Sequence, residues 1–360
     1  MKRRIVLTGG GTAGHVTPNL ALIEKLQSLG WEIDYIGSKN GPEKNIIQSI
    51  NVRYHIINTG KLRRYFSWQN FIDPFRIMQG ICQAYALLYT LKPDIIFSKG
   101  GFVAFPVVFA AWLRKIPIVA HESDLTPGLA NRISYPFVRN ICVTFAAAKK
   151  YFKNSNKIII TGTPLRKEIL NGKRDQGLAL CDFTKDKPCL LVIGGSQGSA
   201  VINQIIRKSL PKLTEKLQIF HICGQGKLDL NLKNIPGYFQ IEYATSELPH
   251  IFAASDIIVS RAGANTIYEI LALKKPHILI PLPITISRGD QIQNANYFAT
   301  QGVSTVIQEE QLTEEVLLTA LINLLNQTKI IQDKINALGY TNATDTIVDI
   351  LRRAITVGRH

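Results

Sequence analysis

The sequence predicts an α/β protein with two domains, each built on a parallel β-sheet with helices on both faces. Three observations support this prediction. A chain of 360 residues is long enough for two domains. Short apolar runs alternate with helical stretches along the whole chain, which is typical of parallel sheets. A glycine-rich turn between a predicted strand and a predicted helix occurs twice, at residues 9–14 and 194–198.

Each glycine-rich turn begins a series of alternating strands and helices. In the first half, a strand segment over 4–10 precedes a helix from Thr17 to Leu29, which ends at Gly30. The other strand segments of this half are predicted at 31–37, 94–101, 116–123, 140–145 and 157–164. Those of the second half are predicted at 189–199, 217–226, 256–263 and 277–283. We therefore expect two Rossmann-like domains.

The boundary between the domains is predicted at residues 161–166, "TGTPLR", because a proline-containing turn after a strand suits a hinge. This boundary gives an N-terminal domain over 1–162 and a C-terminal domain over 163–340. Apolar residues follow a helical period in Thr344–Val357, beside Arg352 and Arg353. We expect this amphipathic segment to form a closing helix within 341–360 that packs back on the N-terminal domain.

The charge of the chain is its unusual bulk property. Lys and Arg number 42 against 26 Asp and Glu, which leaves a net charge of +16 and a pI of about 9.6. Such a balance favours polyanionic partners, namely nucleic acid, anionic lipid or phosphorylated substrates. The charge alone does not choose among them.

No segment predicts export or insertion into a membrane. The N-terminal residues are basic, but the apolar run that follows is too short for a signal peptide. The longest apolar run, 102–113, contains Pro106 and is shorter than the about 20 residues that a membrane span needs. The five cysteines form no C-x-x-C pair, which indicates a reducing compartment and neither a disulfide framework nor a zinc site.

The first glycine-rich turn, "GGGTAGH", has the G-x-G-x-x-G spacing of a dinucleotide-binding loop. Such a loop also requires an acid at the end of the second strand to hold a ribose. Asp34 lies two or three residues too early for that, so a nicotinamide or flavin site is disfavoured. His15 follows the turn directly. It is either a polar residue that bonds nearby backbone or a histidine aimed into the cleft between the domains, available as a base.

Two segments of the second half predict a site for a nucleotide diphosphate. The loop "GGSQGS" offers Ser196, Gln197 and backbone amides at the start of a helix. A second helix is expected to start near Ala264, after the strand "DIIVS". Glu269 then lies near its second turn, where it is either a surface acid or a carboxylate that accepts two ribose hydroxyls.

Further polar residues follow predicted strands. Arg288, Asp290, Gln291 and Asn294 follow a buried strand and form either a hydroxyl-binding surface or an ordinary polar loop. After another strand, His121, Glu122 and Asp124 are expected to face the inter-domain cleft. Arg166 lies just past the hinge and is either a phosphate ligand or a surface charge. Because the chain has no D-x-D sequence, we expect helix dipoles and arginine, and no metal, to stabilise a leaving group.

The segment 60–80 mixes basic and aromatic residues, as membrane-surface segments do. A core helix with a basic cap is the alternative, and an RNA-binding patch has no recognised motif to support it. The residues expected at the membrane surface are Lys61, Arg63, Arg64, Phe66, Trp68, Phe71 and Phe75.

These motifs occur together in one family. The segments "GGTAGHVTPNLAL", "SKGGFVAFPVVFAAWLRKIPIVAHESDLTPGLANR", "TGTPLR", "GGSQGSAVIN", "SRAGANTIYEI" and "SRGDQIQNANYF" follow in its order and spacing. The chain resembles the MurG family of bacterial glycosyltransferases, glycosyltransferase family 28. The resemblance implies a GT-B fold, in which two Rossmann-like domains face a cleft. It also implies an inverting, metal-independent transfer of N-acetylglucosamine (GlcNAc), without a cofactor, from UDP-GlcNAc to lipid I, an undecaprenyl-diphosphate-linked N-acetylmuramoyl-pentapeptide. The product would be lipid II.

The resemblance also implies roles for single residues. A general base is expected in the N-terminal half, where His15 is favoured over Glu122. The residues implied on the acceptor side are Gly11, His15, Glu122 and Asn131. Those implied for UDP-GlcNAc are Thr12, Ala13, Gly14, Arg166, Ser196, Gln197, Ala244, Ala264, Asn265, Thr266, Ile267, Tyr268, Glu269 and Gln291. Asp124 stands where many members have asparagine, in "HESD" instead of "HEQN".

The partners implied are UDP-GlcNAc, lipid I, an anionic phospholipid surface on the cytoplasmic face of the membrane, and other cell-wall synthesis proteins. Nucleic acid is not expected. One rival is another UDP-sugar enzyme of GT-B fold, such as a glycolipid synthase or a UDP-GlcNAc 2-epimerase. A basic scaffold or nucleic-acid-binding protein would explain the charge, but not three glycine-rich nucleotide motifs in order.

Overall fold

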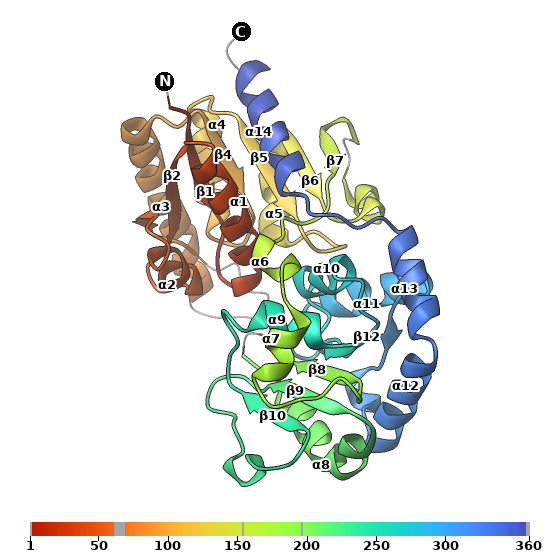
Figure 1. Cartoon of the computed structure of the whole chain (residues 1–360). Helices are drawn as coiled ribbons and strands as arrows, with labels where there is room; N and C mark the ends of the chain where they lie inside the picture. Colours follow the sequence, from red (N-terminus) through yellow and green to blue (C-terminus); the bar gives the residue numbers. More distant parts are fainter. Residues whose placement is uncertain (1, 61–68, 153–154, 196, 358–360) are drawn as a thin grey trace. The chain divides into compact units, whose positions relative to one another are not determined.

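The computed structural model describes residues 2–60, 69–152, 155–195 and 197–357 (Figure 1). The chain forms two compact units, one of Met1–Leu165 with Asn342–His360 and one of Arg166–Thr341. The domain boundaries predicted at 162 and 340 differ from this division by a few residues. That the first unit carries the acceptor side and the second unit the nucleotide site stays a prediction.

The first unit is built on a parallel sheet of seven strands in the order β3-β2-β1-β4-β5-β6-β7. The strands are β1 (Arg4–Thr8), β2 (Glu32–Ser38), β3 (Arg53–Ile57), β4 (Ile95–Ser98), β5 (Ile118–Glu122), β6 (Asn140–Val143) and β7 (Ile158–Ile160). The strand order reverses between β1 and β4. In parallel sheets, ligands bind outside the carboxyl ends of the strands at such a point.

Helices cover both faces of this sheet. They are α1 (Thr17–Ser28), α2 (Pro42–Gln48), α3 (Gln69–Leu91), α4 (Ala104–Leu113), α5 (Leu129–Ser134) and α14 (Thr344–Val357). Side chains of β1 alternate between the faces, because successive residues of a strand point to opposite sides. Ile5 and Leu7 pack with α1 and α14, whereas Val6 packs with α3 and α4. Within the described parts of the chain, no helix is both long and apolar enough to cross a bilayer.

The C-terminal helix α14 belongs to the core of the first unit, beside α1 (Figure 1). Its buried side chains include Ile347 and Leu351, both 0% exposed. The chain reaches α14 through a segment that runs along residues 163–165. There the Asn342 side chain accepts from Leu165 N at 3.0 Å and donates to Leu165 O at 2.8 Å. These bonds join the two places where the chain passes from one unit to the other.

The second unit has a six-stranded parallel sheet in the order β10-β9-β8-β11-β12-β13. The strands are β8 (Cys189–Ile193), β9 (Gln218–Ile222), β10 (Tyr238–Ile241), β11 (Ile257–Ser260), β12 (His277–Leu279) and β13 (Thr305–Val306). The helices are α6 (Lys167–Leu170), α7 (Arg174–Ala179), α8 (Ala200–Lys216), α9 (Leu248–Ala254), α10 (Ala264–Ala272), α11 (Asp290–Thr300), α12 (Glu314–Asn326) and α13 (Thr328–Ala337). The order reverses between β8 and β11. The prediction of two Rossmann-like domains is confirmed.

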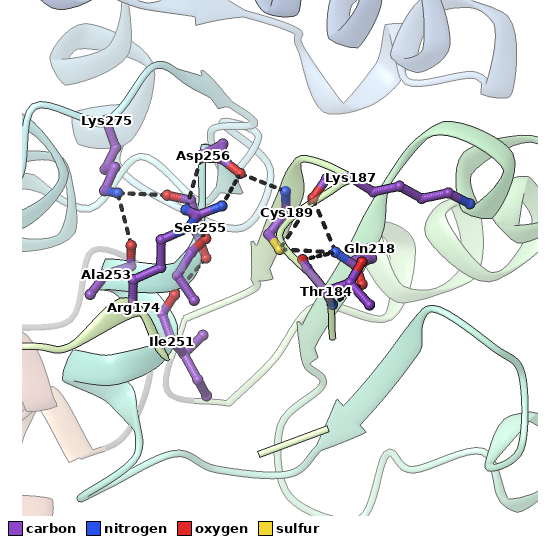
Figure 2. A network of polar contacts seen from close by, with 11 residues as sticks. Arg174, Thr184, Lys187, Cys189, Gln218, Ile251, Ala253, Ser255, Asp256 and Lys275 are labelled. Atoms are coloured by element: carbon purple, nitrogen blue, oxygen red, sulfur yellow. Dashed lines mark hydrogen bonds and ion pairs between the residues drawn. The ribbon is translucent and has the colours of Figure 1, made fainter. Parts of the chain in front are cut away.

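A polar network joins the amino ends of the central strands of this second sheet (Figure 2). The Arg174 guanidinium forms two parallel bonds to the Asp256 carboxylate, at 2.9 and 3.2 Å. Asp256 also accepts from the backbone N–H of Cys189 at 2.8 Å, so it links the starts of β11 and β8. The Lys275 ammonium donates to Ser255 O at 2.6 Å. Because these groups lie at the end of the sheet away from the glycine-rich loop, we assign the network to stability.

We predict that Asp256→Ala lowers the free energy of unfolding of the second unit by about 1–3 kcal/mol, because the Cys189 N–H loses its side-chain acceptor and Arg174 loses its ion-pair partner. Tryptophan fluorescence would not report on the second unit, because all three tryptophans of the chain, Trp31, Trp68 and Trp112, belong to the first. Hydrogen exchange of peptides from β8 and β11 is therefore the suitable measurement.

The matched control is Lys329→Ala, which removes a pair with Asp333 whose side chains are 85% and 61% exposed. Exposed pairs of this kind contribute less than about 0.5 kcal/mol. Equal effects of the two substitutions would contradict the role given to Asp256.

Candidate active site

Two loops of the first unit meet where its strand order reverses. One follows β1 and contains the first glycine-rich turn, and the other follows β4. Gly10 N donates to Gly100 O at 3.3 Å. A Cβ on Gly101, where φ is +82°, would lie only 2.1 Å from Gly10 O. The two loops therefore touch through their backbones, and residue 101 has no room for a side chain.

His15 lies on the first of these loops, beside the second. It ends a short 3₁₀ turn, Ala13–His15, and α1 begins two residues later with Pro18 in its first turn, a favoured place for proline. Its ring carbon Cδ2 is 3.1 Å from a Cβ placed on Gly101. Asn19 Nδ2 donates to His15 O at 3.4 Å and to Tyr35 Oη at 3.1 Å. The imidazole is thus carried by a segment that the sheet holds in place.

Glu43 is a buried carboxylate at this loop that the sequence analysis missed. It lies in the first turn of α2 and is 0% exposed. Its Oε2 accepts from Gly11 N at 3.2 Å, and its Oε1 accepts from Ser38 N at 3.1 Å. The N–H of Gly11 therefore already has an anionic partner from the chain itself. An acid after proline at a helix start, "GPE", was the available signal.

Asp34, the acid considered for a ribose, is engaged elsewhere. It is 0% exposed and pairs with Arg53 at 3.0 Å and with His55 at 2.8 Å, both on β3. Its carboxylate therefore serves the contact between β2 and β3. Together with Glu43, this arrangement agrees with the expectation that the first glycine-rich turn holds no dinucleotide.

Glu122 ends β5 and is 2% exposed. Its carboxylate accepts four hydrogen bonds, from Asp124 N (3.1 Å), Gly128 N (3.2 Å), Asn131 Nδ2 (2.7 Å) and Tyr135 Oη (3.1 Å). Burial and the nearby Asp124 raise its pKa, against the hydrogen bond from Asn131. A carboxylate with four protein donors holds the loop over 124–135 in shape. We infer that Glu122 positions this loop and that His15 is the stronger candidate for the base.

Lys99 and His121 are two further buried polar residues of this region, since Lys99 follows β4 and His121 lies on β5. Lys99 is 1% exposed and donates to Ser123 Oγ. Burial lowers the pKa of Lys99 to about 8, against the attraction of Glu122 and Asp124. His121 is 0% exposed, bonds Gly162 O at 2.8 Å, and burial and Lys99 hold its pKa well below the ordinary range. His121 is therefore a neutral interior residue.

In the second unit, the glycine-rich loop after β8 leads into α8. Ser199 is the N-cap residue of this helix, and its Oγ accepts from Ile202 N at 3.3 Å. Lys227 Nζ donates to Gln197 O at 2.7 Å and to Gly198 O at 3.3 Å. Lys227 thus holds these two carbonyls of the loop and helps to fix its backbone geometry. Ser196 lies outside the described residues.

Gln291 lies in the first turn of α11, and its side chain has a defined orientation. Its Oε1 accepts from Ala262 N at 3.3 Å and from Leu282 N at 3.1 Å. Two backbone donors require the oxygen at this position, so the amide group presents its Nε2 donor in the other direction. A Gln291 that contacts a ligand would do so as a hydrogen-bond donor.

The helix α10 begins at Ala264, as predicted, at the carboxyl end of β11. Ile267 and Tyr268 are buried, so their side chains belong to the core. Glu269 is partly exposed, and burial raises its pKa to about 7, against the attraction of Arg166. Arg166 and Glu269 therefore lie within electrostatic reach of one another inside the second unit.

The comparisons with known proteins identify the family of the chain. The model of the glycosyltransferase family 28 N-terminal domain matches residues 5–143, and that of its C-terminal domain matches residues 189–349. The chain belongs to glycosyltransferase family 28. A UDP-N-acetylglucosamine–N-acetylmuramyl-(pentapeptide) pyrophosphoryl-undecaprenol N-acetylglucosamine transferase of Legionella pneumophila (strain Lens) is 56% identical over 98% of this chain and 97% of its own. The protein of the same name from Clostridium perfringens (strain 13) is 52% identical over 98% and 99%.

Solved structures also resemble this family 28 chain. The crystal structure of Acinetobacter baumannii MurG matches with a TM-score of 0.77 and 26% identity, over 98% of this chain and 99% of that one. A UDP-GlcNAc 2-epimerase from Neisseria meningitidis, bound to UDP-GlcNAc, matches with a TM-score of 0.68 but only 15% identity, over 98% and 100%. At that identity, the second match shows a shared fold and nothing more.

The residues implied for a family 28 site lie on both units of the structure. Within the first unit, Glu122 and Asn131 are hydrogen-bonded, and Gly11 and His15 share the loop after β1. Thr12 and Gly14 on that loop are exposed. Within the second unit, Gln197, Asn265, Thr266 and Gln291 all follow carboxyl ends of strands, and Ala244 packs against the core near β10. The side chain of Ala13 lies outside the described part.

Proposed function

We propose that this family 28 enzyme transfers GlcNAc from UDP-GlcNAc to the C4 hydroxyl of lipid I, with inversion at the anomeric carbon, to form lipid II. The proposal rests on the 56% identity, over 98% of the chain, to a relative whose name specifies both substrates. The similarity is not limited to one domain, because the models of both family 28 domains match this chain, in order.

The donor is proposed to bind to the second unit. The N-termini of α8 and α10 lie on either side of its strand-order reversal, and helix N-termini favour a diphosphate. Arg166 would add positive charge, Glu269 would accept from the ribose hydroxyls, and Gln291 Nε2 would donate to the sugar. Helix dipoles and Arg166 would then stabilise the departing UDP.

His15 is proposed as the general base that takes the proton of the acceptor hydroxyl. The imidazole lies beside Gly101, at the place where the loops after β1 and β4 meet, and the first glycine-rich turn contains no other ionisable side chain. The hydroxyl oxygen would attack the anomeric carbon, the bond to UDP would break, and the proton would pass to the imidazole.

Transfer of labelled GlcNAc to a lipid I analogue tests the function. We expect His15→Ala to lower turnover by roughly 10² to 10⁴ while the Kd for UDP-GlcNAc stays unchanged. Near-normal turnover in this variant would exclude His15 as the base. Conversion of UDP-GlcNAc without any acceptor would instead support the epimerase alternative.

The pKa of Glu269 predicts how donor binding depends on pH. A carboxyl group whose pKa is raised to about 7 is mostly protonated below that pH. If the carboxylate accepts from the ribose, the Kd for UDP-GlcNAc should rise roughly tenfold as the pH falls from about 8 to about 6. Calorimetry across this range measures the slope. Glu269→Gln should remove it, and an unchanged slope in that variant would assign the titration to another group.

Peripheral binding to the cytoplasmic face of the membrane is proposed through α3. The residues predicted for the membrane at 61–68 lie outside the described part of the chain, and Phe71 lies in α3 without a described side chain. Phe75, Met78, Tyr85 and Tyr89 follow one side of α3 and are 78%, 61%, 43% and 64% exposed. The Arg114 guanidinium lies 4.9 Å from the ring centroids of Tyr85 and Tyr89. Exposed aromatic and basic groups together favour an anionic lipid surface.

We predict that Phe75→Glu with Tyr89→Glu weakens binding to vesicles that contain phosphatidylglycerol, because both changes add negative charge to an apolar surface. Vesicle sedimentation measures the binding. Ile330→Glu is the matched control, since Ile330 is also exposed, at 56%, but lies on α13 of the second unit. Unchanged binding in the double variant would refute the assignment.

A further inference from the structure

Arg261 is a buried cation of the second unit that no step above has used. It follows β11 directly and is 8% exposed. Its guanidinium donates to Ile280 O at 3.1 Å, to Pro281 O at 3.3 Å and to Ser199 Oγ at 2.7 Å. It also pairs with Glu309. These acceptors belong to three different connections, those that follow β8, β12 and β13.

The first of these connections is the glycine-rich loop. Ser199 Oγ accepts from Arg261 and also from Ile202 N, so a single oxygen joins the guanidinium to the start of α8. The position of this oxygen determines where α8 begins. The N-terminus of α8 is one of the two helix N-termini proposed to meet the diphosphate.

The second connection carries Gln291. Arg261 holds the carbonyl of Pro281, and the next residue, Leu282, donates its N–H to Gln291 Oε1. The other donor to this oxygen is the N–H of Ala262, the neighbour of Arg261 in sequence. Arg261 is therefore the sequence neighbour of one residue that orients the Gln291 amide, Ala262, and it is hydrogen-bonded to the neighbour of the other, Leu282.

We propose that Arg261 is the positioning residue of the donor site, which sets the diphosphate loop through Ser199 and the sugar-binding amide through Pro281. Glu309 holds its guanidinium in this orientation. The inference rests on the proposed function, because it concerns the same donor. It concerns geometry, since Arg261 would act through the protein groups that it holds.

The charge of the cluster supports a positioning role over direct attraction of the donor. The Arg261 and Glu309 side chains are only 9% and 13% exposed, so the carboxylate neutralises the guanidinium inside the protein. A planar guanidinium reaches separate acceptors with a fixed fork of N–H groups. A lysine would keep the charge but present its donors from one atom, which cannot hold three connections at once.

The other end of β11 provides a matched control. Arg174 pairs there with Asp256, directly before the strand, as Arg261 pairs with Glu309 directly after it. Both pairs belong to the same unit, and both arginines also bond backbone carbonyls. Only the pair of Arg261 lies at the edge where the donor is proposed to bind. A purely structural role would confine the effects of substitutions in both pairs to stability.

The experiment compares Arg261→Lys, Glu309→Gln and Arg174→Lys with the wild-type protein. Calorimetry gives the Kd for UDP-GlcNAc and for UDP, and thermal melts give Tm. We expect Arg261→Lys to raise the Kd for both ligands ten- to a hundredfold, because a shift of about 1 Å in the loop and in Gln291 would misplace their contacts to the donor. Glu309→Gln should shift both Kd values in the same direction by less. Arg174→Lys should lower Tm with unchanged Kd values.

The inference fails if Arg261→Lys and Glu309→Gln lower Tm as Arg174→Lys does and leave both Kd values unchanged. Should Arg261→Lys not fold, Glu309→Gln decides alone, because its side chain keeps its size and its partner keeps the other acceptors. Absence of UDP-GlcNAc binding in the wild-type protein would instead refute the proposed function, independently of Arg261.

Discussion

Parallel pairing of all the described strands is the constraint on which the candidate site depends. Because every pair within each sheet is parallel, the carboxyl ends of all its strands lie at one edge. The order of the strands then selects a place on that edge, between β1 and β4 in the first unit and between β8 and β11 in the second. The loops that carry His15, Ser199 and Arg261 all follow one of these four strands. Composition says less about the candidate site, since a net charge of +16 is compatible with several kinds of partner.

The sequence predicted the elements well where local signals are strong. The helix Thr344–Val357 agrees with its prediction at both ends, and α10 begins at Ala264 as expected. Hydrophobic periodicity and glycine turns are local, so one segment suffices to recognise them. Glu43, Lys99 and Arg261 were missed because their roles depend on partners distant in sequence. Glu43 bonds a residue 32 positions away, and Arg261 reaches one 62 positions away.

The two candidates for the base show why residue type alone did not decide between them. Histidine and glutamate both accept protons, and both were placed at the carboxyl end of a strand. In the fold, Glu122 accepts four hydrogen bonds from its own loop, while His15 lies where two glycine loops touch. A fully bonded carboxylate is a poor partner for a substrate hydroxyl, since each new contact would replace an existing one. Tertiary contacts thus identify Glu122 as a residue that shapes its loop, and the assignment of His15 as the base stays a proposal.

The polar contacts at the two ends of β11 have different roles in the second unit. Before the strand, Asp256 links Arg174 to the backbone of β8, and after it, Arg261 links the loops of β8 and β12. Both arrangements satisfy buried polar groups and therefore both stabilise the fold. They differ in what they hold, because the amino edge carries strand starts and the carboxyl edge carries the loops that are proposed to bind the donor. A substitution at the first edge changes how much of the protein is folded, whereas one at the second also changes the shape of the site that remains.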